Sequence, residues 1–235
     1  MKKLILIAIF AIFSTSSAIS AELTPSVGIS YNNSAFAAEG TEKNFDPDGN
    51  LKTVTQEYGA FAETFASVFV ELGIGDLIAV GIDYVPGDIE TPTNVSREGS
   101  GSSETGKMGP GNSSVSANFE DLTTVYAKLN IPFLGGSYIK GGFSQVDVVI
   151  NENMASGSTY KDVDTDGYFA AVGYNHELTN GISVRAEVAA HQFDDVASDN
   201  GVAASAGTVA NGGRNEVLVE SMWGARGTIS LVKSF

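Results

Sequence analysis

Hydrophobic and polar residues alternate with a period of two through most of this chain after residue 22, which is typical of β-strands. In the stretch ISVRAEVAAH, Val184, Ala186 and Val188 alternate with Arg185 and Glu187. The same rhythm predicts eight strands, at about 24–36, 54–71, 76–85, 118–130, 136–149, 166–178, 182–193 and 216–235. The chain is therefore expected to be all-β.

The predicted strands are long. Several reach about ten residues or more, whereas strands of ordinary globular sheets average about five or six. A tilted strand that crosses a bilayer needs about nine to eleven residues. The length favours a membrane barrel over a soluble secreted β-sandwich. A sandwich would have the same period-two pattern, but the protein would then be extracted into buffer without detergent.

The predicted connections alternate between short and long. The short ones are 72–76, 131–136 and 178–181, and Asn180-Gly181 is a strong hairpin-turn signal. The long ones, at about 37–52, 86–118, 150–166 and 194–216, are polar. Short turns at one end and long loops at the other are typical of bacterial outer-membrane barrels. In lipid every backbone polar group needs a partner, so the sheet must close. The pattern predicts an eight-stranded antiparallel up-and-down transmembrane β-barrel.

The first 21 residues have the layout of a secretory signal peptide. Lys2 and Lys3 precede the apolar run 4–13, and the small residues STSSAISA follow. The apolar run is too short to span a bilayer as a helix, which disfavours a retained anchor. We expect cleavage after Ala21, with Ala18 and Ser20 as alternatives. The chain then divides into a signal peptide, 1–21, and a barrel domain, 22–235, exported to the outer membrane.

Composition narrows the function. The chain has 28 acidic and 13 basic residues, for a net charge of −15, and no cysteine. Nucleic acid is excluded as a partner, because phosphate binding needs clustered Lys and Arg. Disulfides and thiolate chemistry are excluded as well.

The inward face of the predicted barrel carries balanced charge. With the polar face turned inward, the ionisable residues expected in the lumen are Glu63, Asp83, Lys128, Lys140, Arg185, Glu187, Glu220 and Arg226. An eight-stranded barrel is narrow enough for side chains to fill it, and buried charges persist when they are paired. We predict an ion-pair network that plugs the lumen. The alternative is a selectivity path for a small solute.

The register of residues 58–72 is ambiguous from sequence. Phe61, Glu63, Phe65 and Phe69 share one face of this segment, so three aromatic rings accompany an inward acid. A β-bulge would turn some rings outward. If the rings point inward, part of the lumen is apolar, which suits a hydrophobic solute.

The last predicted strand carries apolar residues at alternate positions and a terminal aromatic ring: Ile229, Leu231 and Phe235. This pattern resembles the C-terminal assembly signal of outer-membrane barrels, except that Lys233 stands where an aromatic or aliphatic residue is usual. Together with the signal peptide and the loop asymmetry, residues 22–235 resemble the small outer-membrane β-barrels of the OmpA/OmpX or opacity-protein kind. The resemblance implies contact with outer-membrane lipid and recognition by the barrel-assembly machinery. It covers adhesins, structural barrels and narrow channels, so it does not select a function.

Two loop segments carry carboxylates at alternate positions. Asp162, Asp164 and Asp166 followed by Gly167 resemble the first half of an EF-hand loop, but Gly173 stands where the bidentate Glu belongs. This segment is either a solvated acidic loop or a weak Ca²⁺ or Mg²⁺ site, and no other cofactor is expected. The second segment, 46–50, is expected to form a turn.

Catalytic signals are weak. Ser183, Glu187 and His191 share one face of a predicted strand, but Glu187 and His191 would be about 13 Å apart, too far for a proton relay. A polar pair between His191 and Glu220 is the simpler expectation. We predict a protein that is not an enzyme. It would have a structural or surface-interaction role, with acidic loops facing an extracellular partner that the sequence does not identify. The alternative is a narrow channel for small, hydrophobic solutes.

Overall fold

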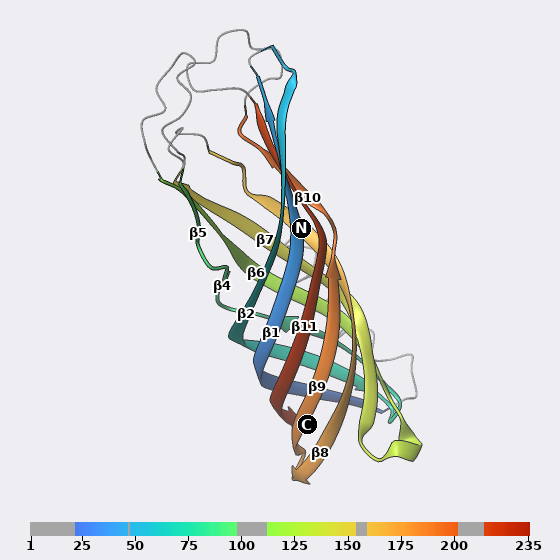
Figure 1. The fold of residues 1–235 in the computed structure, drawn as a ribbon. Coiled ribbons are helices and arrows are strands. Elements are labelled where there is room, and N and C mark those ends of the chain that lie inside the picture. Colours follow the sequence, from blue (N-terminus) through green and yellow to red (C-terminus); the bar gives the residue numbers. More distant parts are fainter. Residues whose placement is uncertain (1–21, 47, 98–111, 154–158, 202–213) are drawn as a thin grey trace.

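The computed structural model describes residues 22–46, 48–97, 112–153, 159–201 and 214–235. The predicted signal peptide, 1–21, lies outside these residues. Eight strands, all of them long except the seven-residue β3, form the wall of a closed antiparallel sheet (Figure 1): β1 (Leu23–Phe45), β2 (Leu51–Ile74), β3 (Ile78–Tyr84), β6 (Asn112–Asn130), β7 (Ser137–Asn153), β8 (Val163–Thr179), β9 (Ile182–Phe193) and β11 (Asn215–Ser234). Each pairs with its neighbour along the chain, and β1 pairs with β11 to close the ring. The prediction of an eight-stranded up-and-down barrel is confirmed, and the sandwich is excluded.

Four short elements accompany the ring. The strands β4 (Ile89–Glu90) and β5 (Asn94–Arg97) pair with β6, and β10 (Val196–Asp199) pairs with β11. A single 3-10 turn, Pro132–Leu134, joins β6 to β7. Within the described residues, no helix is long and apolar enough to cross a membrane.

The two ends of the barrel differ as the sequence predicted. At one end the connections are tight, and both residues of the Asn180-Gly181 turn adopt positive φ, 50° and 71°. At the other end β1, β2 and β11 extend beyond the level where β3 ends (Figure 1); β1 pairs with β2 up to Phe45 opposite Leu51 and with β11 up to Asn44 opposite Asn215. Most of the predicted loop 37–52 is therefore a hairpin. The hairpin was not predicted as strand because both of its faces are polar, so hydrophobic and polar residues do not alternate along it.

The wall is apolar outside and polar inside. Exposed aliphatic side chains cover the outer face of the ring strands, among them Val27, Ile29, Val68, Val125, Ile139, Val172, Val188 and Leu231. Buried polar side chains cover the inner face, among them Asn32, Ser67, Thr124, Lys128, Arg185, Glu187 and Arg226. This inversion of the usual globular pattern is what a barrel wall in contact with lipid requires.

Inward glycines lie directly opposite inward aromatic rings. The register places five such pairs around the wall: Gly28 and Phe69, Gly81 and Tyr126, Gly173 and Tyr138, Gly224 and Phe36, and Gly167 and Phe193. A methyl group added at Gly173 would lie 2.3 Å from Cζ of Tyr138. Each ring therefore lies flat over a neighbouring strand that has no side chain in the way. This arrangement fits large rings into a narrow cylinder.

One strand is paired on a single edge for much of its length. β2 pairs with β3 only from Val68 to Ile74, while its other edge pairs with β1 throughout. After Tyr84 the chain stays with β6, where Val85 donates its N–H to the Leu122 carbonyl. Among the described residues, the stretch 51–67 of β2 has no ladder on the β3 side. The wall therefore has a seam between β2 and the β4–β5 segment.

Candidate functional site

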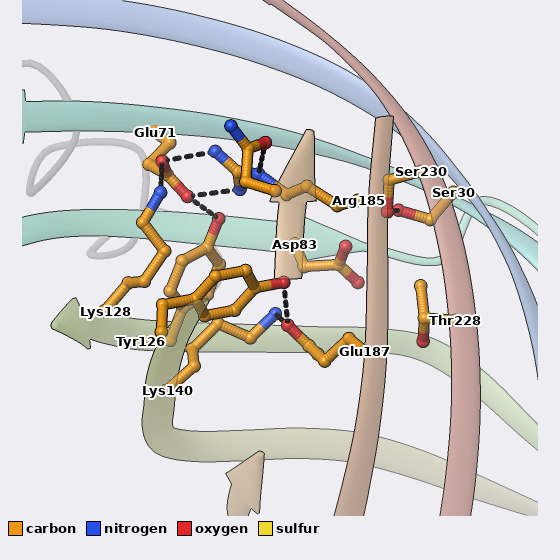
Figure 2. Close-up of polar contacts among 12 residues, drawn as sticks. Ser30, Glu71, Asp83, Tyr126, Lys128, Lys140, Arg185, Glu187, Thr228 and Ser230 are labelled. Carbon is orange, nitrogen blue, oxygen red and sulfur yellow. Dashed lines mark hydrogen bonds and ion pairs between the residues drawn. The ribbon is translucent and has the colours of Figure 1, made fainter. Parts of the chain in front are cut away.

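The lower lumen, toward the tight turns, is filled by an ion-paired cluster centred on Glu71 of β2 (Figure 2). The Arg185 guanidinium binds the Glu71 carboxylate with both terminal nitrogens, each at 2.8 Å. The Lys128 ammonium lies 2.5 Å from Glu71 Oε1, and the Tyr126 hydroxyl donates to Oε2 at 3.2 Å. Both carboxylate oxygens are thus engaged by charged or polar donors, which is the condition for keeping an acid buried.

A second ion pair lies beside the first. Lys140 of β7 contacts Glu187 of β9 at 2.7 Å, and the Tyr138 hydroxyl donates to the same oxygen at 3.0 Å (Figure 2). The Lys140 ammonium also lies 4.6 Å from the centre of the Tyr126 ring, within the range of a cation–π contact. We call the side chains of Glu71, Tyr126, Lys128, Tyr138, Lys140, Arg185 and Glu187 the ionic plug.

Above the ionic plug, the polar lining continues as a chain of hydrogen bonds that ends at the Asp83 carboxylate. Thr228 donates to Asn32 at 2.8 Å, Asn32 donates to Ser67 at 3.1 Å, and Ser67 donates to Asp83 at 3.0 Å. These residues come from β11, β1, β2 and β3, so the chain crosses four adjacent strands. It holds the Asp83 carboxylate against the wall.

The eight predicted lumen charges are thus only partly brought together. Lys128, Lys140, Arg185 and Glu187 lie in ion pairs, and Asp83 is hydrogen-bonded to Ser67. Glu63 points inward on β2, but no ion pair of the described residues includes it. Arg226 is buried inside and has no carboxylate partner among the described residues.

Glu220 differs from the expectation. It pairs with Glu39, which shares the outward parity of Tyr31 and Ala35 on β1. The reason is a bulge: Ser221 has a φ of 54°, and β11 gains one residue relative to β1 between Trp223 and Glu220. The bulge reverses the parity of β11 above it. Glu220 therefore lies away from the lumen charges, and His191 lies opposite Gly224 instead of Glu220.

The upper lumen is lined by aromatic rings. Phe36 stacks on Phe61 at 5.2 Å between ring centres, and Phe61 stacks on Phe119 at 6.1 Å. Phe193 lies 6.5 Å from Phe36 and 6.2 Å from the His191 ring. We call Phe36, Phe61, Phe119 and Phe193 the aromatic collar. These separations are typical of favourable ring contacts.

The three Phe rings of residues 58–72 all point inward. Phe69 is buried against Gly28, and Phe61 and Phe65 pack on an internal apolar cluster of Val85, Ile89, Leu122, Val146 and Val148. No register shift interrupts β2 between residues 53 and 74, so no bulge turns the rings outward. Phe36, Phe61, Phe119 and Phe193 are only partly buried. Inward rings that keep accessible surface can contact a solute.

The loop carboxylates do not converge. Asp164 and Asp166 are exposed on β8, and Asp162 accepts a hydrogen bond from the Ile150 N–H at 3.0 Å. No group of three or more His, Cys, Asp or Glu in the described part of the chain is placed to hold a metal ion. Asp46 instead closes the β1–β2 turn, with its Oδ1 accepting the N–H groups of Asp48 at 3.0 Å and Asn50 at 2.8 Å. The hydrogen bonds from Asn50 are the main reason that the pKa of Asp46 is lowered.

The remaining sequence candidates occupy separate places. Ser183, Glu187 and His191 are all buried on the inner face of β9, but Ser183 donates to Asn175 and Glu187 binds Lys140. Ile229, Leu231 and Phe235 are exposed on the outside of β11. Lys233, the departure from the terminal pattern, donates to the Asn180 carbonyl of the nearby turn.

Glu71 and three of the four rings of the aromatic collar were not predicted from the sequence to lie in the lumen. Glu71 shares the parity of Phe69 and Ser67, which was a usable signal, but its place beside a tight turn concealed it. Phe36, Phe119 and Phe193 lie on three strands that are far apart in sequence. Only the register brings them together.

No protein-family model and no curated protein matches the sequence. Solved outer-membrane barrels are similar in structure. The outer membrane protein OprG from Pseudomonas aeruginosa matches with a TM-score of 0.53 and 13% identity, over 91% of this chain and 98% of that one. The outer membrane protease OmpT from Escherichia coli matches at 0.45 and 10%, over 94% and 99%. The outer membrane protein AlkL matches at 0.43 and 12%, over 94% of both chains. The match to OprG shows an outer-membrane β-barrel fold.

Proposed function

We propose that this protein is an outer-membrane barrel that binds small apolar solutes in its upper lumen and does not conduct ions through its base. The observation that carries the proposal is the division of the lumen. The partly exposed aromatic collar lies above the ionic plug. In the plug, the single carboxylate of Glu71 binds both Arg185 and Lys128.

The two regions favour different occupants. Aromatic rings offer large apolar area with few polar groups, which suits a small hydrophobic molecule. The ionic plug has its charges paired at 2.5–2.8 Å across the barrel. Ions would have to break these pairs to pass. We therefore favour a solute-binding compartment over an open pore.

The seam in the wall supplies a route between this compartment and the outside. Phe61 and Phe65 lie on the part of β2 that has no ladder toward β3, and they pack on Ile89 of β4. Side chains separate more easily than a hydrogen-bonded ladder. An apolar solute in the collar would exchange through the seam between β2 and β4.

Location and assembly belong to the same proposal. Residues 1–21 would direct export, the apolar outer face would contact outer-membrane lipid, and the exposed side chains of Ile229, Leu231 and Phe235 would be read by the barrel-assembly machinery. A Phe235 deletion is expected to lower the amount of folded barrel in the outer membrane. An unchanged amount would contradict this role for β11.

The test of solute binding uses the purified barrel in lipid nanodiscs and 2-naphthalenemethanol as an apolar probe. Titration calorimetry, corrected with empty nanodiscs, is expected to show saturable binding. Phe61→Ser should weaken it about tenfold or more, because a polar group replaces a ring of the collar. The matched control is Phe143→Ser on the outer face of β7, which should leave the affinity unchanged.

Two results would overturn this function. One is the absence of saturable binding to the wild-type barrel. The other is a sustained single-channel current in planar bilayers, because the ionic plug should keep the wild-type barrel silent.

A surface-interaction role is a second candidate, favoured by the β1–β2 hairpin. The two strands pair from Leu23 to Phe45, and the Asp46 turn fixes the tip. A rigid hairpin at the upper end of the wall, with β1 also held by β11 up to Asn44, is a suitable binding element for an extracellular partner. Replacing residues 42–53 by a two-residue turn should abolish adhesion to cells or matrix while leaving solute binding intact. Unchanged adhesion would exclude the hairpin from this role.

A further inference from the structure

The boundary between the aromatic collar and the ionic plug contains buried polar atoms without partners. Arg226 Nε, His191 Nε2, Ser34 Oγ and, just below them, Glu187 Oε1 make no hydrogen bond among the described residues. All four residues are buried, with at most 7% of their surface exposed. Buried polar groups are nearly always hydrogen-bonded, so such a cluster needs an explanation.

The register places Ser34 and Arg226 directly beneath the collar and His191 level with its lowest ring. Ser34 pairs with Arg226, and the next inward row up the barrel is Phe36 paired with Gly224 and Gly224 paired with His191. Diagonal neighbours on one sheet face lie within reach of long side chains. Arg226 is therefore next to both His191 and the lowest ring of the collar.

The space over Gly224 is filled by a ring of the collar. A methyl group there would lie 2.8 Å from the Phe36 ring and 3.5 Å from Cβ of His191. The Phe36 ring therefore lies across Gly224 toward His191, and His191 is nearly parallel to Phe193, at 10°. Apolar ring faces and unsatisfied donors meet at one place.

The nearby carboxylates are already engaged. Glu187 binds Lys140 and Tyr138 through Oε2 while its Oε1 has no partner among the described residues, and Glu71 binds Arg185 and Lys128. Asp83 accepts from Ser67 and feels the charge of Arg226 without forming an ion pair with it among the described residues. Glu63 lies one strand beyond Ser34 from Arg226, and its carboxylate accepts a hydrogen bond from the Thr64 N–H. The charges of Arg226 and Lys140 both act on His191. Lys128, Lys140 and Arg185 each form an ion pair, so Arg226 is the buried lumen cation of the described residues that no carboxylate binds directly.

We propose that Arg226 forms a head-group site for the carboxylate of an amphipathic monocarboxylic acid, whose apolar body contacts the aromatic collar. An Arg guanidinium recognises a carboxylate through paired, charge-assisted hydrogen bonds. His191 and Ser34 would satisfy the remaining oxygen positions. This inference rests on the proposed solute-binding function and specifies its ligand class.

The test compares two probes of equal shape, 2-naphthoate and 2-naphthalenemethanol, in nanodiscs at neutral pH. The wild-type barrel is expected to bind the acid about tenfold more tightly than the alcohol. Arg226→Gln should remove that preference and leave the affinity for the alcohol unchanged. Arg226→Lys, which keeps the charge, should retain part of the preference, and Phe61→Ser should weaken both probes.

The outcomes separate the two proposals. If the wild-type barrel binds both probes equally, or if Arg226→Gln keeps the preference, the head-group site is wrong, while solute binding stands as long as Phe61→Ser weakens both. If neither probe binds the wild-type barrel, both proposals fail. The ratio of the wild-type affinities for the acid and the alcohol tests the head-group site even if the Arg226→Gln barrel does not fold.

Discussion

Glu71 is the residue on which two buried cations depend. Its carboxylate holds Arg185 and Lys128 at 2.5–2.8 Å in the barrel interior. Glu71→Gln would leave both cations without a charged partner, and breaking a buried pair in this way costs about 3–5 kcal/mol. We expect a loss of that size in the free energy of unfolding, measured by urea titration in lipid vesicles.

Glu63→Gln is the matched control for this prediction. It lies on the same strand and the same face as Glu71 but in no ion pair of the described residues. Its effect is expected to stay within about 0.5 kcal/mol, as for substitutions away from special features. Equal losses for the two variants would show that the ion pairs of Glu71 add no stability beyond that of a carboxylate outside any ion pair.

Asp46 gives the β1–β2 turn a dependence on pH. Its pKa is lowered by hydrogen bonds from Asn50 and Asp48, so the folded turn favours the ionised carboxylate. The stabilisation is therefore present above the pKa of the free side chain, about 4, and is lost as the pH falls through the lower folded value. An NMR titration of the Asp46 carboxyl group should show a midpoint below the ordinary aspartate value of about 4.

Glu220 and Glu71 show which features of single residues could be predicted from the sequence. Alternation alone assigned most lumen residues to the inner face, because side chains in a strand alternate strictly. It failed at Glu220, since one extra residue at Ser221 reverses the parity. It missed the role of Glu71 because partners two and three strands away cannot be read from local pattern.

At the scale of elements, the pairing of glycines with rings fixes how neighbouring strands fit. Gly173→Ala on β8 would place a methyl group 2.3 Å from Cζ of Tyr138 on β7. The ring must then move, and its hydrogen bond to Glu187 is lost. Overpacking of this kind typically costs about 1–3 kcal/mol. Urea unfolding in vesicles should show this loss in stability.

Gly59→Ala on β2 is the control, because nothing lies within 4 Å of a methyl group there. It should be neutral or slightly stabilising, since Ala has less conformational freedom than Gly in the unfolded chain. A cost at Gly59 equal to that at Gly173 would mean that strand glycines matter for another reason than ring packing.

The strands themselves were predictable where they face lipid. The alternation of Val184, Ala186 and Val188 reflects one apolar and one polar surface. The extensions of β1 and β2 toward Phe45 and Leu51 were not, because both surfaces of that hairpin are polar. The seam also lay beyond prediction, since it depends on where β3 ends and on which neighbour the chain follows afterwards.

For the whole molecule, the outer surface should behave as a lipid contact. Val188 is 61% exposed near the middle of β9. Val188→Arg is expected to cost about 2–4 kcal/mol in lipid vesicles, because a charge then faces hydrocarbon. Gln192→Arg, on the same face nearer the upper rim, should cost about 1 kcal/mol or less. A negligible effect at Val188 would mean that this face does not contact lipid.

Closure could be predicted from the sequence because strand length, short turns and terminal pattern all agree. The division of the lumen into plug and collar could not. It depends on a register that brings Phe36 beside Phe61 and Arg185 beside Glu71, and no local signal encodes these pairings.

The glycine opposite each ring has a consequence for related sequences. Because Tyr138 occupies the space that a side chain at Gly173 would need, neither position is free to change alone. Evolution should replace the two together, a bulky residue moving from one strand to the other while the combined volume stays constant. A collection of homologues would then reveal the interior of the barrel through coupled exchanges, before any coordinates were known.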